Sequence, residues 1–179
     1  MARTLPPYKF CPLCGSALRT REIGHRERQA CPACPFVYWQ NPVPGVAVVA
    51  FERDRVVLVR TAQPGYLHGQ WCFPCGHVEY DEHLRDAAAR EFEEETGLTV
   101  KVGDVYHVDS NFFEPWGVNS VGVWFEGRIT GGTLSPGGDV MEAGTFPLNG
   151  LPKKIAYKSD MRVLRKLCHE RGYPEPDIS

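Results

Sequence analysis

Three glutamates near the middle of the chain have a spacing that suits the binding of divalent metal ions. If the run Gly76–Leu98 contains a helix that turns by about 100° per residue, Glu91, Glu94 and Glu95 lie in one arc and Glu93 faces the opposite side. The same arc holds the apolar side chains of Leu84, Ala87, Ala88 and Phe92. Carboxylates on a packing face need a cationic partner, because burying an unpaired charge is costly. Clustered oxygen ligands favour Mg²⁺ or Mn²⁺, ions that commonly bridge to substrate phosphates.

The spacing along this run resembles the signature of the Nudix hydrolase family. Gly76 is followed after five residues by Glu82 and, seven residues later, by the stretch 90–98 (REFEEETGL), which agrees with the Nudix box at every specified position. The preceding segment Gly69–Pro74 is similar to the strand that leads into the box in this family. Cys75 is a departure, because many relatives have a second glycine there. We expect this change to affect how the loop backbone approaches the metal.

The resemblance implies the ligands of a catalytic metal. Glu91, Glu94 and Glu95 are the expected side-chain ligands of Mg²⁺ or Mn²⁺, and a backbone carbonyl at or beside Gly76 is expected to add another. Metal ions held in this way lower the pKa of bound water and polarise phosphoryl oxygens. The family resemblance therefore predicts cleavage of a phosphoanhydride by in-line attack of water.

Arg90 is expected to act beside Glu91 and Glu94 in catalysis. Its position on the helix points away from the metal arc, so we expect it to orient the preceding loop through an ion pair with Glu82 or Glu79. A purely structural role for Arg90 stays open. His77 either touches a phosphate or is an ordinary loop histidine, and we favour the second interpretation.

The general base stays open among three carboxylates. Glu91 ranks first, and Asp139 and Glu142 are the alternatives from a later segment. Glu142 is also a candidate for substrate binding, with an ion pair to an arginine or lysine as the structural alternative.

Substrate identity depends on the variable segment 109–117 (DSNFFEPWG). Phe112 and Trp116 are candidates for stacking on a nucleobase or flavin ring, although the same side chains suit a core. A zinc ribbon followed by a Nudix body resembles the NADH pyrophosphatases and their relatives that act on ADP-ribose or FAD. The serine-led motif of NADH pyrophosphatases is echoed only by Pro115-Trp116 and Ser120, so we do not expect that specificity.

Four cysteines predict a zinc site at the start of the chain. Cys11 and Cys14 form one C-x-x-C pair, and Cys31 and Cys34 form a second pair sixteen residues later, a spacing typical of four-cysteine zinc sites. Disulfides are the weaker alternative, since nothing marks the chain for secretion and seven cysteines is an odd number. A ribbon of about thirty residues buries little apolar surface, so the metal would supply most of its folding free energy.

The other three cysteines are predicted to be packing residues. Cys72 and Cys75 also form a C-x-x-C, but residues three apart in an extended segment project to opposite faces. Cys168 falls in the apolar stripe of the last predicted helix.

Charge divides the chain into a basic head and an acidic body. The formal net charge is −2 over 179 residues, which argues against a protein built mainly to grip nucleic acid. Residues 1–40 hold six basic side chains and two glutamates, a net +4 against −6 for the remainder. Four basic side chains, Arg19, Arg21, Arg26 and Arg28, alternate as on one face of a strand, although solubility alone explains such residues in many ribbons.

The pattern of elements predicts an α+β fold, an α/β/α sandwich with a mixed sheet, after a small zinc ribbon. The turn-forming connector Asn41–Gly45 divides the ribbon, residues 1–40, from the Nudix domain, residues 41–179. The box helix should begin near Asp81 and end at Gly97, because these residue types suit the two ends of a helix. Strands are expected over 45–51, 55–61, 98–108, 118–129 and 143–147, with a turn at 131–132 and a closing helix over 159–171.

The leading hypothesis is a metal-dependent hydrolase that cleaves the pyrophosphate of a nucleoside diphosphate linked to another group. ADP-ribose, FAD and NADH are the candidate substrates. One alternative is a nucleotide sensor or nucleic-acid-binding regulator, and another is removal of a nucleotide cap from RNA. The expected partner is a small nucleotide; nucleic acid is open but not favoured, a homodimer is open, and a membrane is not expected. No apolar run is long enough to cross a bilayer and no signal peptide is recognisable, so the expected location is cytoplasmic.

Overall fold

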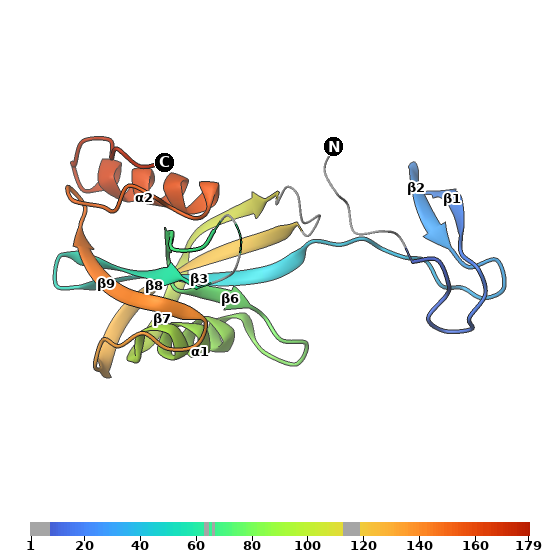
Figure 1. The fold of residues 1–179 in the computed structure, drawn as a ribbon, viewed down its shortest axis with the longest axis horizontal. Helices are drawn as coiled ribbons and strands as arrows, with labels where there is room; N and C mark the ends of the chain where they lie inside the picture. The colour runs from blue at the N-terminus through green and yellow to red at the C-terminus, as the bar shows by residue number, and fades with distance from the viewer. Residues whose placement is uncertain (1–7, 63–64, 66, 113–118) are drawn as a thin grey trace. The chain divides into compact units, whose positions relative to one another are not determined.

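The structure is a computed structural model in which residues 8–62, 65, 67–112 and 119–179 are described. The chain divides into two compact units (Figure 1). The first comprises Met1–Pro42 with Phe112–Asn119, and the second comprises Val43–Asn111 with Ser120–Ser179. Within the described residues, no helix has the length and apolar character that a membrane span requires.

The first unit is built on a two-stranded antiparallel hairpin. Strand β1 (Arg19–Ile23) pairs with β2 (Arg26–Ala30), and Gly24 and His25 at the turn both have positive φ values. Single bridges join Phe10 to Ala17 and Ala30 to Val37. These short elements bury few large side chains, so the hairpin depends on something other than a hydrophobic core.

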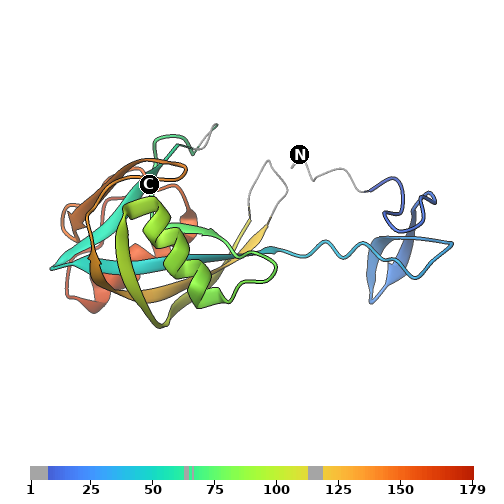
Figure 2. The same cartoon turned by 90° about the horizontal axis from the view of Figure 1, so that it is seen from below.

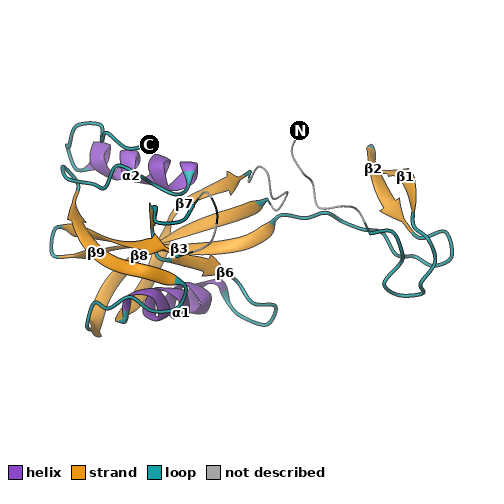
Figure 3. Cartoon of the chain, in the orientation of Figure 1, coloured by secondary structure: helices purple, strands orange, loops and turns teal. Residues whose placement is uncertain are grey.

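The second unit contains a seven-stranded mixed sheet. Its strands are β3 (Val43–Glu52), β4 (Arg55–Thr61), β5 (Trp71–Cys72), β6 (Cys75–His77), β7 (Leu98–Asn111), β8 (Ser120–Gly132) and β9 (Val140–Pro147). The main path runs β5-β4-β3-β8-β7, with β6 pairing with β3 and β9 with β4. Strands β3 and β8 are parallel, whereas the other pairs are antiparallel. Figure 3 shows how the strands form one layer between two helices.

Each helix covers its own face of this sheet, which confirms the predicted α/β/α sandwich. Helix α1 (Leu84–Thr96) lies across one face of the sheet (Figure 2). Its side chains Ala87, Ala88 and Phe92 pack in a cluster with Val48 and Phe125. Helix α2 (Lys158–Glu170) buries a second set of side chains on the other face. That set includes Val163, Leu164, Leu167 and Cys168, packed against Leu58, Phe73 and Trp124. The two apolar faces of the sheet therefore produce two cores rather than one.

Helix α1 starts later than the sequence predicted. The N-cap is His83, whose ring accepts a hydrogen bond from the Arg85 amide at 3.4 Å, and Asp81 lies in the preceding loop. The predicted end is correct, since Gly97 has φ 67° and its amide donates to the Glu93 carbonyl at 2.8 Å. A preference for capping alone placed the start at Asp81, but the polar contacts of the loop described below hold residues 79–82 outside the helix.

The predicted turn at Gly131-Gly132 is also wrong. Both glycines belong to β8, where Gly132 pairs with Leu98 and Gly131 with Thr99. Gly132 has φ 91°, and a Cβ atom there would lie 2.3 Å from the Gly97 carbonyl oxygen. Gly132 thus allows a close approach to the end of helix α1 rather than a reversal of the chain.

Candidate active site

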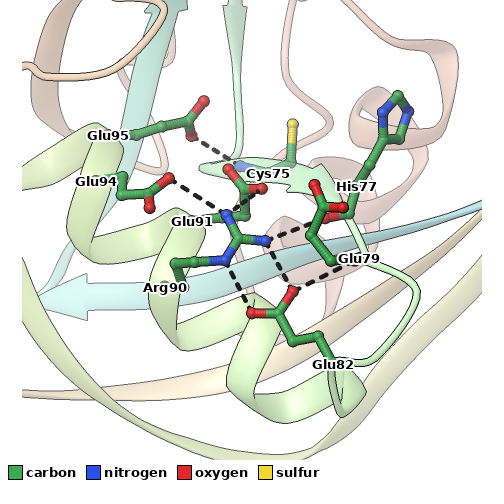
Figure 4. A network of polar contacts seen from close by, with 8 residues as sticks. All are labelled: Cys75, His77, Glu79, Glu82, Arg90, Glu91, Glu94 and Glu95. Atoms are coloured by element: carbon green, nitrogen blue, oxygen red, sulfur yellow. Dashed lines mark hydrogen bonds and ion pairs between the residues drawn. The ribbon is translucent and has the colours of Figure 1, made fainter.

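The three box glutamates of helix α1 differ widely in their exposure to solvent. Glu95 is 5% exposed, the Glu91 side chain 17%, and the Glu94 side chain 52%. Leu84, expected on the packing face, is 39% exposed. The predicted arc is therefore only partly correct, because Phe92 is buried whereas Leu84 and Glu94 are exposed. Figure 4 shows the three carboxylates on the side of the helix that faces β6.

Gly76 brings the β6 backbone against the Glu91 carboxylate. Gly76 pairs with Val46 of β3, and this pairing fixes the position of β6 relative to the sheet. A Cβ atom at Gly76 would lie 2.0 Å from Cδ of Glu91 and 2.2 and 2.3 Å from its two oxygens. No residue with a side chain fits here while Glu91 keeps this position, which explains a glycine before the box in physical terms.

Glu95 is a buried carboxyl group with an acidic neighbour. The Cys75 amide donates to Glu95 Oε2 at 2.8 Å, which joins the helix to the start of β6 (Figure 4). Burial raises the pKa of Glu95 to about 9, and the amide of Cys75 opposes that shift. The charges of Asp139 and Glu91 and a hydrogen bond with the Asp139 carboxyl group contribute to the same rise. Without a cation, Glu95 therefore holds a proton at neutral pH.

Asp139 reaches Glu95 through the segment between β8 and β9. In that segment the Ser135 amide donates to the Thr96 carbonyl at 2.8 Å, and this hydrogen bond holds the segment against the end of helix α1. Asp139 itself accepts a hydrogen bond from the Ala62 amide at 3.0 Å through its backbone carbonyl. Of the two later carboxylates considered as general base, Asp139 is thus the one in contact with a box glutamate.

Glu142 lies in a different environment. It pairs with Arg60 across the β4–β9 ladder, with Arg60 Nε 3.3 Å from Glu142 Oε2, and its side chain is 51% exposed. This is the ion-paired position that was the structural alternative to substrate binding.

Arg90 lies among the box glutamates rather than away from them. Its guanidinium forms the expected pair with Glu82, at 2.8 Å from Nε to Oε1 and 2.9 Å from Nη2 to Oε2. The same group contacts Glu91 at 2.7 Å and Glu94 at 3.3 Å through Nη1 (Figure 4). Nη2 also donates to the His77 carbonyl at 3.3 Å, while the His77 ring points away from the carboxylates (Figure 4). Arg90 therefore ties the loop to the helix, and it lowers the pKa of Glu82.

The donor set of this cluster fits a hard divalent cation. Its groups are carboxyl oxygens, and a cation could replace the proton that buried Glu95 holds in the absence of metal. Within the described part of the chain, however, these oxygens do not converge within 4.8 Å as a group of three. Arg90 neutralises Glu91 and Glu94 in this arrangement, so a metal ion would have to compete with its guanidinium.

A buried aspartate that sequence reasoning missed anchors the strand before the site. Asp160, in helix α2, is 2% exposed and accepts hydrogen bonds from the Phe73 amide and from Trp124 Nε1, both at 3.0 Å. Burial raises its pKa to about 7, although both donors oppose that shift. Phe73 lies between β5 and β6, so Asp160 fixes the turn that leads to Gly76. The sequence feature that could have revealed this residue is the position of an aspartate within the apolar stripe of a predicted helix.

The prediction that Cys72 and Cys75 project to opposite faces is wrong. Their side chains interact with each other, and burial raises the pKa of both thiols. The segment is not uniformly extended, because β5 ends at Cys72 and β6 begins at Cys75 with a turn between them. Cys168 is fully buried in the α2 core, as expected for a packing residue.

The four N-terminal cysteines form a compact group that could hold a metal ion. Their sulfur atoms all lie within 4.8 Å of one another, with Cys11 and Cys34 at 3.5 Å and Cys14 and Cys31 at 3.4 Å. A tetrahedral Zn²⁺ centre with Zn–S bonds of about 2.3 Å places sulfurs about 3.8 Å apart. Hydrogen bonding with Ser16 lowers the pKa of Cys14 to about 6, which favours the thiolate that a metal requires.

Of the two aromatic candidates for substrate stacking, only Phe112 is among the described residues. Phe112 follows β7 and is 77% exposed, which suits a stacking surface and excludes a core position. Trp116 lies outside the described residues.

Comparison with known proteins agrees with this geometry. Residues 41–167 match the family model of the NUDIX domain, and the chain belongs to this family. A crystal structure of a NUDIX hydrolase from Nitrosomonas europaea superimposes with a TM-score of 0.81 and 28% identity, covering 96% of this chain and 97% of that one.

Two curated relatives indicate the range of activities among similar sequences. The "NAD-capped RNA hydrolase NudC" of Stutzerimonas stutzeri is 30% identical over 173 residues, 94% of this chain and 59% of the relative. The "ADP-ribose pyrophosphatase" of Methanocaldococcus jannaschii is 35% identical over 111 residues, 62% of this chain and 66% of the relative. The chain thus spans about three-fifths of the length of the first of these proteins.

Proposed function

We propose that this protein is a metal-dependent hydrolase that cleaves the pyrophosphate bond of a nucleoside diphosphate linked to another group. The observation that carries the proposal is the buried Glu95 carboxyl group, which has Glu91 and Asp139 as acidic neighbours in a domain of the Nudix family. Such a group of carboxyls is unfavourable unless a cation or a proton compensates it. ADP-ribose is the leading candidate substrate, with FAD and NADH as the others.

In this proposal Glu91, Glu94, Glu95 and a backbone carbonyl at or beside Gly76 hold Mg²⁺ or Mn²⁺. When bound, the metal polarises phosphoryl oxygens and lowers the pKa of water. Arg90 holds the loop through Glu82 and limits the motion of Glu91. Glu91 ranks first as general base, and Asp139 stays a candidate because of its contact with Glu95.

We also propose the boundaries and the accessory metal. Residues 1–40 form a zinc ribbon in which Cys11, Cys14, Cys31 and Cys34 hold one Zn²⁺, and residues 41–179 form the hydrolase domain. The four-cysteine group supports this assignment. Reduced thiols are needed for such a site, and the cysteines among the described residues are free, which suits the cytoplasm. For the assembly state, we propose a monomer, with a homodimer as the alternative.

Phe112 and Trp116 are proposed to stack on the substrate ring, and the 77% exposure of Phe112 supports its part in this. For Glu142 the pair with Arg60 favours a structural role over substrate binding.

A panel assay of the full chain tests the proposal. ADP-ribose, FAD, NADH and a nucleoside triphosphate are incubated with Mg²⁺ and then Mn²⁺, and the products are separated by chromatography. We expect Glu94→Gln to reduce turnover at least hundredfold, roughly the 3 kcal/mol that loss of metal stabilisation of a transition state costs. Glu93→Gln is the matched control, because it removes the same charge from the exposed side of the same helix.

The same panel separates an enzyme from a nucleotide sensor. Undiminished turnover by Glu94→Gln would refute the ligand assignment. Saturable binding of ADP-ribose without any product from the wild-type chain would favour the sensor instead.

Hydrolysis of NAD-capped RNA is the second candidate function. The match to a relative of that name extends over 94% of this chain, a span that includes the basic N-terminal region. A short RNA with and without the cap, assayed beside free NADH, distinguishes this substrate from the small nucleotides.

A further inference from the structure

The hairpin of the first unit separates its charges by face. In the β1–β2 register Arg21 lies opposite Arg28, Arg19 opposite Ala30 and Arg26 opposite Ile23. Opposite residues of an antiparallel pair share a face, and so do residues two apart. Arg19, Arg21, Arg26 and Arg28 therefore all lie on one side of the hairpin, which we call the arginine face.

The opposite face carries the two glutamates of the hairpin. Glu22 pairs with Glu27 in the register, and next to them Gln29 Nε2 donates to Thr20 Oγ1 at 2.9 Å. Like charges opposite each other destabilise a strand pair, and here this happens on both faces. A hairpin that needed charge only for solubility would mix the two signs, which is the arrangement that limits repulsion.

Three arginines of this face have no acidic partner among the described residues. Arg19, Arg21 and Arg26 are exposed, and none of the ion pairs of the described chain includes them. A guanidinium group in this state keeps all its donors for an external anion. Because these arginines are distributed along two strands, they suit an extended polyanion with regularly spaced negative charges.

Trp39 adds an aromatic surface to the arginine face. The Arg28 guanidinium lies 4.6 Å from the centroid of the Trp39 ring and donates to the Ile23 carbonyl, so the ring and the hairpin are held together. Trp39 nevertheless stays 52% exposed. Tyr8, which packs edge-on against Tyr38 at 4.8 Å, is a second exposed ring in the same unit.

We propose that the arginine face, with Trp39, is a binding surface for single-stranded RNA. Arginines pair with successive phosphates through charge-assisted hydrogen bonds, and an exposed indole stacks on an unpaired base. An acidic protein segment would supply negative charge but no nucleobase for Trp39 to stack on. A duplex would supply phosphates, but its bases are already stacked inside the helix. The choice of RNA over DNA rests on the second candidate function above, whereas the contact chemistry follows from the hairpin alone.

The test uses the zinc-loaded full chain and an unstructured RNA of about 20 nucleotides with a 5′-hydroxyl end, followed by fluorescence anisotropy from about 50 mM salt upward. This RNA has no pyrophosphate, so its binding is independent of hydrolysis. The triple variant Arg19→Ser/Arg21→Ser/Arg26→Ser should bind at least tenfold more weakly. Its plot of log affinity against log salt should lose about 2 units of slope, from about 0.7 per phosphate contact.

A matched variant controls for net charge. Arg53→Asn/Lys101→Ser/Arg128→Ser removes the same number of exposed positive charges from the second unit, and asparagine suits the φ of 59° at Arg53. This variant should bind RNA as the wild type does. An equal loss in both triple variants would overturn the arginine face as a site, and so would wild-type binding by the triple serine variant.

Folding and strand type are checked in parallel. All variants should retain one zinc per chain and wild-type hydrolysis of the small nucleotide. If the triple serine variant loses zinc, Arg19→Lys/Arg21→Lys/Arg26→Lys replaces it, and this chain should keep the salt slope while binding more weakly. Trp39→Ala should weaken single-strand binding by roughly tenfold, whereas Tyr173→Ala, at an exposed ring of the second unit, should not. Tighter binding of duplex RNA or of single-stranded DNA would overturn the assignment to single-stranded RNA.

Discussion

The two units of this protein prepare their candidate metal sites in opposite ways. In the first unit four sulfur atoms lie within 4.8 Å of one another around a hairpin that buries few large side chains. In the second unit a sheet with two hydrophobic cores holds carboxyl groups that do not converge as a group of three among the described residues. Where the core is small, the ligands must gather to complete the fold. Where the core is large, the ligands can remain separate until a metal and substrate arrive.

Protons and arginine take the place of metal in the second unit. Glu95 holds a proton and interacts with Asp139, and Arg90 contacts Glu91 and Glu94. These substitutes keep the fold stable without a cation, but each must be displaced before the site can act. Metal removal is therefore expected to abolish folding in one unit and only activity in the other.

The largest expected effect comes from Cys31→Ser. Losing one of four thiolates should release Zn²⁺ and unfold the hairpin, because zinc supplies about 10 kcal/mol or more to such small domains. Elemental analysis should find no zinc, and amide exchange in β1 and β2 should become fast. Hydrolysis of the small nucleotide should persist, since the second unit has its own cores.

Cys168→Ser is the matched control for this change. It replaces a buried thiol in the core of the second unit and should retain one zinc per chain. Full zinc content in Cys31→Ser would contradict the four-cysteine assignment, and loss of hydrolysis would contradict the independence of the two units.

An intermediate effect is expected from Gly76→Ala. The added methyl group would lie 2.0 Å from Cδ of Glu91, so this flexible side chain should swing away while the backbone stays in place. We expect turnover to fall by ten- to hundredfold, about 1.4 to 3 kcal/mol, with a small change in melting temperature. Gly131→Ala is the control, because its added atom would make an ordinary 3.4 Å contact with the Thr99 hydroxyl oxygen. Equal turnover in the two variants would show that the position of Glu91 is not critical.

The smallest effect is a pH dependence confined to the second unit. The pKa of Glu95 is about 9 in the folded protein against an ordinary value of 4.5, so between these values the folded state holds a proton that the unfolded chain has released. Stability should therefore fall as pH rises from about 5 to 9, by less than about 1.4 kcal/mol per pH unit, the limit for one proton.

Urea unfolding of the zinc-loaded chain across this range, without added Mg²⁺ or Mn²⁺, measures the slope. Glu95→Gln should flatten the slope between about pH 7 and 9, above the raised pKa of Asp160, and addition of Mg²⁺ should do so in the wild type by replacing the proton. The same slope in Glu95→Gln would assign the titration to another group, for which Asp160, with a pKa raised to about 7, is the natural comparison.

Much of the architecture was readable from local patterns. Valine-rich runs separated by turn residues gave β3 and β4, and Gly97 ended helix α1 where its residue type predicted. The antiparallel pairing of those strands was expected, but the parallel pairing of β3 with β8 was not, because no local signal connects residues so far apart in the chain.

The errors concern contacts between distant segments. Helix periodicity placed Glu94 and Leu84 on the packing face with Phe92, but both side chains are exposed whereas Phe92 is buried. Cys72 and Cys75 were assigned to opposite faces by assuming an extended segment, whereas a turn brings their side chains together.

The sequence by itself determined which chemical groups this protein has: a box of carboxylates, two pairs of cysteines, and glycines where side chains would not fit. Their order along the chain is enough to identify the family, since the box spacing is a local property of one loop and one helix. Only the tertiary structure decided their electrostatic state. It placed Asp139 beside Glu95, Arg90 between Glu91 and Glu94, and Asp160 under the turn before Gly76. Charge interactions depend on distance and burial in space, and neither quantity is written in the spacing of residues along the chain.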